Sequence, residues 1–96
     1  MKVEWDKNKN RTNIKKHGVS FKEAAEVFDD PFHISLLDTR FDYFEERWIT
    51  LGAAKSGKII VVGHLYHLTG SEEAVRIITA RKATKKERIQ YEKIED

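Results

Sequence analysis

The chain has 96 residues, of which 40% are hydrophobic and none is cysteine, so disulfide bonds and thiolate zinc sites are excluded. A chain of this length folds around one core, and we expect a single domain over residues 1–96. The net charge is only +2, no apolar run approaches the roughly 20 residues of a membrane-spanning helix, and the start lacks a signal-peptide core, so we expect a cytoplasmic protein with no membrane partner.

The distribution of charge is more informative than its sum. Residues 7–16 carry five cations and no acid, whereas residues 23–46 carry eight acids against Arg40 alone. With a further basic stretch at 81–88, the chain is basic at both ends and acidic between them. One face can therefore meet an anion and another a basic partner, although solvated helix faces of opposite sign explain the same pattern.

The N-terminal third predicts a short strand over 2–5 and two helices. The signals are Asp6 as the cap of a helix over 7–16, Gly18 as its end, Ser20 with Glu23 as a second capping box, and Asp29-Asp30-Pro31 as the stop of the second helix. The first helix has little apolar content beyond Ile14, so we expect it to pack through one narrow stripe.

The rest of the chain alternates strands and turns before a last helix. Strands are predicted over 32–38, 47–53, 59–68 and 75–82, and the last three should form an antiparallel meander. Thr84 and Glu87 have the spacing of another capping box, so a helix should begin at Lys85. The predicted fold is α+β: an antiparallel sheet of about four to five strands, with two N-terminal helices packed on one face, a C-terminal helix and the other face open.

The stretch 75–88 combines a buried strand with a basic helix start. Five cations stand against Glu87 where the strand leaves the core: Arg81, Lys82, Lys85, Lys86 and Arg88. A cationic strand end beside exposed helix N–H groups suits a phosphate, whereas a solvated basic helix face is the structural alternative.

The reactive side chains indicate metal-free chemistry. None of the four histidines has zinc-site spacing, so we expect no metal and no cofactor, and no phosphate-binding loop or supported catalytic triad is present. RNA supplies its own nucleophile in the 2′-hydroxyl, so a protein can cleave it by positioning, proton transfer and cationic stabilisation. Arg47, Arg76 and Arg81 are the apt cations because each lies on or beside a central strand. His64 is the apt acid or base because the strand over 59–68 should carry it out of the core. Cross-strand ion pairs and a hydrogen-bonded strand histidine explain the same residues without catalysis.

Motifs spread in order over nearly the whole chain resemble one known family. They are Glu4-Trp5-Asp6, Asn13, Lys16-His17-Gly18-Val19-Ser20-Phe21, the run EAAEVFDDP at 23–31, Glu46-Arg47, Leu51-Gly52, Val62-Gly63-His64, and the run RIITARKAT at 76–84 followed by Glu87-Arg88. This series resembles the BrnT family of type II toxins, from which the segment between Val62 and Ala74 departs. The resemblance implies a RelE-like fold, RNA cleavage in the bacterial cytoplasm, and neutralisation by a BrnA antitoxin whose ribbon-helix-helix domain binds promoter DNA.

The combined prediction is a metal-independent endoribonuclease that inhibits growth until its antitoxin binds, in a complex with at least two copies of each chain. The candidate catalytic residues are Arg47, His64, Arg76, Arg81 and His17, and the candidate RNA-binding residues are Lys16, Lys82, Lys85, Lys86 and Arg88. His17 and His64 both match family-like positions, so the acid or base stays open between them.

Two other functions compete with the nuclease. One is a catalytically weak antitoxin-binding partner that acts mainly in a promoter-binding repressor complex. The other is a generic RNA-binding module, which is disfavoured because the chain lacks the stacked aromatic pattern of such sheets.

Overall fold

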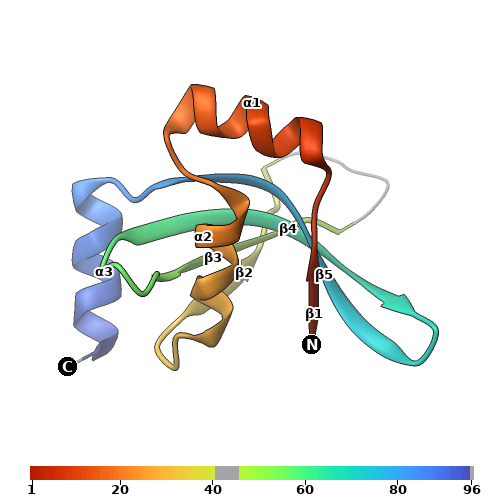
Figure 1. Ribbon diagram of the computed structural model, residues 1–96. Helices are drawn as coiled ribbons and strands as arrows, with labels where there is room; N and C mark the ends of the chain where they lie inside the picture. The colour runs from red at the N-terminus through yellow and green to blue at the C-terminus, as the bar shows by residue number, and fades with distance from the viewer. Residues whose placement is uncertain (41–45, 96) are drawn as a thin grey trace.

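The computed structural model describes residues 1–40 and 46–95 (Figure 1). Its elements are β1 (Lys2–Glu4), α1 (Lys7–His17), α2 (Phe21–Ala25), the 3-10 helix η1 (Glu26–Asp29), β2 (Ile34–Leu37), β3 (Trp48–Ala53), β4 (Ile59–Thr69), β5 (Glu72–Lys82) and α3 (Lys85–Glu95). The predicted α+β class and element order are confirmed, with η1 added at the end of the second helix. In the part of the chain that is described, no helix is long and apolar enough to span a membrane.

The five strands form one mixed sheet in the order β1-β5-β4-β3-β2. The meander of β3, β4 and β5 is antiparallel as predicted, but β1 pairs with β5 in the parallel sense, so the prediction of an antiparallel sheet is wrong at this edge. Alternation of polar and apolar residues predicts a strand but says nothing of its partner or direction. Here Val3 pairs with Val75 and packs against the core, and this burial stabilises the parallel pairing.

The core lies between the sheet and the segment that contains α2 and η1. Its fully buried members include Phe21 from α2, Val27 from η1 and Ile60 from β4. Burial of each such large side chain contributes about 1.5–3 kcal/mol of transfer free energy. Close contact also needs Gly52 on β3, where an added Cβ would lie 2.6 Å from Cγ1 of Val27. The predicted N-caps of α1 and α2 are confirmed, since Asp6 accepts from the Lys9 N–H and Ser20 accepts from the Glu23 N–H.

Helix α1 does not pack on a sheet face through an apolar stripe, so that prediction is wrong. It packs against β5, above that strand in Figure 1, and its Ile14 side chain is 42% exposed. The anchor is instead the buried Asn13, whose amide donates to the Ala80 carbonyl (2.8 Å) and accepts from the Ala80 N–H (3.1 Å). The same amide donates to Val19 (2.9 Å). Asn13 thus takes the place of a neighbouring strand beyond the end of β1 and satisfies the backbone of β5.

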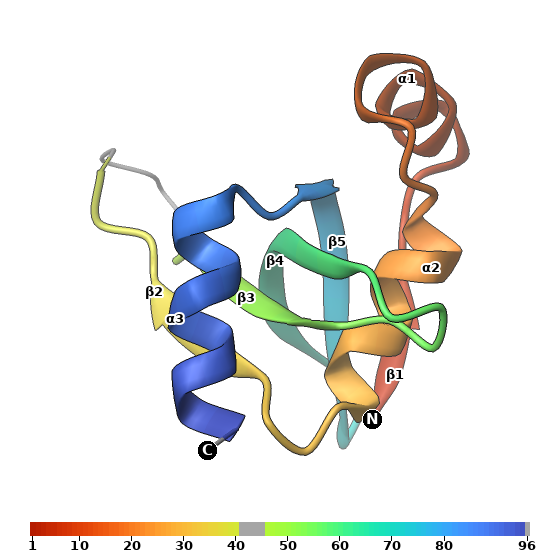
Figure 2. The ribbon, with the colours of Figure 1, turned by 90° about the vertical axis from the view of Figure 1, so that its left-hand side faces the viewer.

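Helix α3 begins at Lys85 as predicted, but it flanks the face opposite α2. Its Glu87 and Gln90 side chains line a groove with Ile49 and Val61, which alternate with the residues that face Val27. Figure 2 shows α2 and α3 with β3 and β4 between them. The expectation that this second face is left open is therefore wrong where α3 lies.

Asp30 ties three parts of the fold together after η1. Its carboxylate accepts from the Tyr91 hydroxyl on α3, from the Ala53 N–H (2.8 Å) and from the Phe32 N–H (3.0 Å). Burial raises the pKa of Asp30, but these three hydrogen bonds outweigh burial and hold the pKa below its ordinary value. Asp30, which the sequence indicates only as part of a helix stop, thus anchors α3 to the rest of the fold.

Candidate active site

A pocket of about 260 Å³ lies on the sheet face opposite α2 and is lined by cationic side chains. We call it the cationic pocket; its charged and titratable lining residues are His17, Asp38, Arg40, Arg47 and Arg81. Gly63 on β4 lies on its floor, where an added Cβ would stand 2.6 Å from the Thr79 hydroxyl. Three of the five predicted catalytic residues, His17, Arg47 and Arg81, therefore meet in one place although they lie far apart in the sequence.

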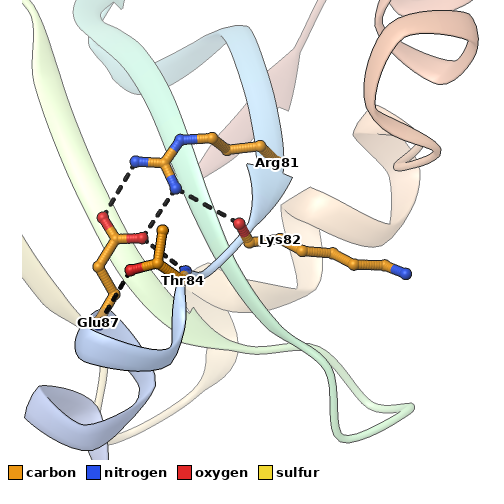
Figure 3. Close-up of polar contacts among 4 residues, drawn as sticks. All are labelled: Arg81, Lys82, Thr84 and Glu87. Atoms are coloured by element: carbon orange, nitrogen blue, oxygen red, sulfur yellow. Dashed lines mark hydrogen bonds and ion pairs between the residues drawn. The ribbon is translucent and has the colours of Figure 1, made fainter.

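Arg81 is held by a bidentate ion pair with Glu87 (Figure 3). Nη1 donates to Oε1 at 2.8 Å and Nη2 donates to Oε2 at 3.0 Å, while Nη1 also reaches the Lys82 carbonyl at 3.3 Å. The hydrogen bonds from Arg81 lower the pKa of Glu87 to about 2, and those to Glu87 raise the pKa of Arg81. Both groups are therefore charged at any pH at which the protein would act.

Arg40 and Asp38 belong to the pocket, although the sequence did not mark them as site residues. Arg40 Nε lies 3.0 Å from Asp38 Oδ1, and this contact with Arg40 holds the pKa of Asp38 below its ordinary value. The Asp38 N–H donates to the Arg47 carbonyl at 2.7 Å, so a backbone hydrogen bond joins these two pocket residues. The available signal was that Arg40 is the lone cation of an acidic stretch, two residues after an acid that follows a strand.

His17 is the only one of the described histidines that lines the pocket. It is the last residue of α1, and its side chain is exposed. Asn13, one helical turn earlier, fixes α1 to β5, while Gly18 ends the helix in the left-handed conformation with φ of 70°. The position of His17 at the pocket rim thus follows from a buried amide and a helix end.

The prediction that β4 carries His64 out of the core is wrong. His64 has no exposed surface, its Nε2 atom is 2.7 Å from the Thr50 hydroxyl, and it meets the rings of Phe28 and Tyr66 edge-on. Burial lowers the pKa of His64 to about 4. The strand continues to Thr69, so His64 lies mid-strand on the α2 side, away from the cationic pocket.

Arg76 also lies outside the lining of the pocket. It pairs with Leu65 across the sheet, and its Nη1 atom lies 3.7 Å from Oε1 of Glu4 on β1. The same Glu4 oxygen lies 2.6 Å from Nε2 of His67. Arg76 therefore makes a cross-strand ion pair, but its partner is Glu4 of the parallel strand β1, an acid that the sequence did not indicate as a partner.

The predicted RNA-binding residues are divided over the surface. Lys82 and Arg88 line a second depression of about 200 Å³ together with Lys58. The other three, Lys16, Lys85 and Lys86, are exposed side chains. None of the five lines the cationic pocket.

Within the described residues, no group of three His, Asp or Glu side chains is arranged to hold a metal ion. Asp38 lines the pocket and Glu87 contacts the lining residue Arg81, and each of these carboxylates is paired with an arginine. What the pocket offers a ligand is guanidinium charge beside one imidazole, and this combination suits a phosphate group.

A small α+β domain with arginines and a histidine gathered in one pocket is of the class that can bind and rearrange a phosphodiester. Comparison with protein families matches residues 5–87 to the ribonuclease toxin BrnT of type II toxin-antitoxin systems, and the chain belongs to this family. The fold is similar to the 1.1 Å crystal structure of the Brucella abortus ribonuclease toxin BrnT, with a TM-score of 0.60 and 29% sequence identity. The match covers 88% of this chain and 99% of that one. A comparison with curated protein sequences finds no significant match.

Proposed function

We propose that residues 1–96 act as a single toxin domain of RelE-like fold, an endoribonuclease that cleaves RNA in the cytoplasm without a metal and inhibits growth until its antitoxin binds. The observation that carries this proposal is the convergence of His17, Arg47 and Arg81 in the cationic pocket. Membership of a ribonuclease toxin family supports the same reaction class.

The proposed reaction uses the RNA 2′-hydroxyl as the nucleophile. Its oxygen forms a bond to phosphorus, its proton leaves to a base, and the bond from phosphorus to the 5′-oxygen breaks as that oxygen gains a proton. Arg81 and Arg47 stabilise the charge that develops on the phosphorane oxygens, and His17, the imidazole that lines the pocket, moves the proton. The products are a 2′,3′-cyclic phosphate and a 5′-hydroxyl end.

The two proposed roles of the cations can be separated by mutation. Arg81→Ala should lower the maximal rate on the order of 100-fold with little change in RNA affinity, because the guanidinium acts on developing charge. Lys85→Ala, on the exposed start of α3, should instead weaken binding modestly and reduce the salt slope by roughly one counterion. Single-turnover cleavage at two salt concentrations measures both effects, with circular dichroism to show that each variant is folded. Wild-type cleavage by Arg81→Ala at saturating RNA would place the chemistry elsewhere.

Metal independence is tested on the purified wild-type chain. We expect cleavage in EDTA, with products that end in 2′,3′-cyclic phosphate or 3′-phosphate. Loss of activity in EDTA with rescue by a divalent ion would contradict metal independence. Products with 3′-hydroxyl ends would contradict attack by the 2′-hydroxyl and indicate attack by water.

The proposed partner is a BrnA-like ribbon-helix-helix antitoxin, through which the complex binds promoter DNA. Family membership implies an antitoxin partner. Because ribbon-helix-helix domains dimerise, the complex should contain at least two copies of each chain. Light scattering of the purified complex checks this, and a strict one-to-one complex would contradict it.

A second candidate function is the catalytically weak partner that acts mainly in repression. The bidentate Arg81–Glu87 pair favours this second function, because Glu87 already occupies one edge of the guanidinium and leaves fewer donors for a substrate. Absence of RNA cleavage by the folded wild-type chain, together with promoter binding by its antitoxin complex, would support this alternative.

A further inference from the structure

The hydrogen bonds of Arg81 leave one edge of its guanidinium for a ligand. Glu87 occupies the end edge, formed by Nη1 and Nη2, and the Lys82 carbonyl takes a second Nη1 hydrogen (Figure 3). The side edge, formed by Nε and the second Nη2 hydrogen, makes no hydrogen bond to any residue that the structure describes. Two parallel donors on such an edge match two oxygens of one phosphate group.

Glu87 is itself fixed in place by the first turn of α3. Its Oε1 atom accepts from the Thr84 N–H at 2.8 Å, and its own N–H donates to the Thr84 hydroxyl at 3.2 Å. The capping box therefore holds the carboxylate that holds the arginine. The helix is also tied to the core through Tyr91 and Asp30, so its first turn is a rigid support for Arg81.

We propose that Glu87 is a positioning residue: it binds the end edge of Arg81 so that the side edge faces a phosphodiester in the cationic pocket. This inference rests on the proposed function, and it assigns to the capping acid a role in the rate of the reaction. A guanidinium held in one orientation stabilises the developing charge without reorganising during the reaction, whereas a free arginine samples several rotamers. Since Glu87 is an anion, it does not itself attract the substrate, so its loss should affect the rate more than the affinity.

The test is Glu87→Gln, with Glu92→Gln as the matched control. Glutamine can still accept in the capping box but lacks the charge that ties down Arg81. Glu92 is an exposed acid of the same helix, so its variant loses the same charge without touching the pocket. We expect Glu87→Gln to lower the maximal single-turnover rate on the order of tenfold with the RNA affinity little changed, and Glu92→Gln to cleave like the wild type.

A double-mutant cycle shows whether Glu87 acts through Arg81. In an Arg81→Ala background, Glu87→Gln should cause no further loss of rate. NMR relaxation of the Arg81 Nε–H provides a readout that needs no activity: the group should be rigid in the wild type and in Glu92→Gln, and mobile in Glu87→Gln.

The outcomes separate this inference from the proposed function. If Arg81→Ala loses activity but Glu87→Gln cleaves at or above the wild-type rate, the positioning role is overturned and the proposed function stands. An equal loss in both backgrounds would also overturn it, because Glu87 would then act apart from Arg81. Wild-type cleavage by Arg81→Ala would remove the proposed role of the arginine, and the positioning role with it. An unchanged Nε–H relaxation in Glu87→Gln would overturn the inference whether or not RNA is cleaved.

Discussion

His64 is fully buried, and burial favours its neutral form. Phe28 and Tyr66 each place a ring centroid 4.9 Å from the imidazole, and the Thr50 hydroxyl that contacts Nε2 lies 2.7 Å from the hydroxyl of Ser35. Two hydroxyls thus link the buried ring to β2 at the edge of the sheet. The residue stabilises the interface between sheet and η1 only while it is uncharged.

The buried imidazole should make the fold sensitive to mild acid. Burial lowers the pKa of His64 from 6.5 to about 4, so between these values the unfolded chain binds a proton that the folded chain does not. Its contribution is complete above pH 6.5 and is lost as the pH falls towards 4, on the order of 3 kcal/mol in all. Urea unfolding at pH 7, 5 and 4 should show this loss in the wild type and a shallower pH dependence in His64→Gln. Equal pH dependence in both chains would mean that His64 is not held neutral in the folded state.

A second acid transition should be separate, because it belongs to the Arg81–Glu87 pair. The pKa of Glu87 is lowered from 4.5 to about 2, so its ion pair stabilises the folded state above pH 4.5 and is lost as the pH falls towards 2. With both side chains partly exposed, we expect a smaller effect than that of His64. Glu87→Gln should remove this dependence and leave the His64 transition in place, as urea unfolding between pH 5 and 2.5 would show. A wild-type slope in the variant would contradict the assignment.

At the scale of elements, α1 is joined to the sheet by one amide rather than by apolar burial. Asn13→Ala would leave the N–H and carbonyl of Ala80 and the carbonyl of Val19 without partners in a buried setting. We expect a loss of about 3 kcal/mol in the free energy of unfolding. Asn8→Ala, on an exposed position of the same helix, is the control and should change stability by less than about 0.5 kcal/mol. Equal losses in the two variants would show that the contact of Asn13 with β5 does not set the cost.

Sequence reasoning succeeded for elements whose signals are local. The Asp6 cap, the Gly18 end and the Thr84–Glu87 box each depend on residues at most a few positions apart, and each is present in the structure. The parallel pairing of β1 depends on contacts across more than 70 positions, and no periodicity encodes them.

The candidate site shows the same division between local and distant information. Arg47 and Arg81 could be chosen because strand positions fix side chains, and both line the pocket. His64 could not be separated from His17 in this way, because burial depends on which strands and helices close around each residue. The sequence also could not predict which edge of the Arg81 guanidinium is occupied, because Arg81 lies on β5 and its partner Glu87 lies on α3.

At the scale of the whole molecule, much of the acidic middle segment is bound within the fold. Asp30 anchors α3, Asp38 binds Arg40, and Glu23 contacts Lys58 and Ser56. Asp42, which the charge pattern also marks, lies outside the described residues. Reversing the charge of Asp30 or Asp38 would therefore disturb the fold, so a test of this surface has to use its exposed acids.

We expect the exposed acids of the middle segment to steer the antitoxin, while the basic ends meet RNA. Asp29→Lys with Glu46→Lys should slow association with the proposed ribbon-helix-helix antitoxin, by about tenfold at low salt, and flatten its salt dependence. The matched control is Glu72→Lys with Glu73→Lys, which makes the same charge change on the exposed start of β5. Stopped-flow association at several salt concentrations measures the rates, and urea unfolding shows that both double variants keep their stability. If both variants slow association equally, net charge and not the acidic segment steers the partner; if neither does, charge does not guide the encounter.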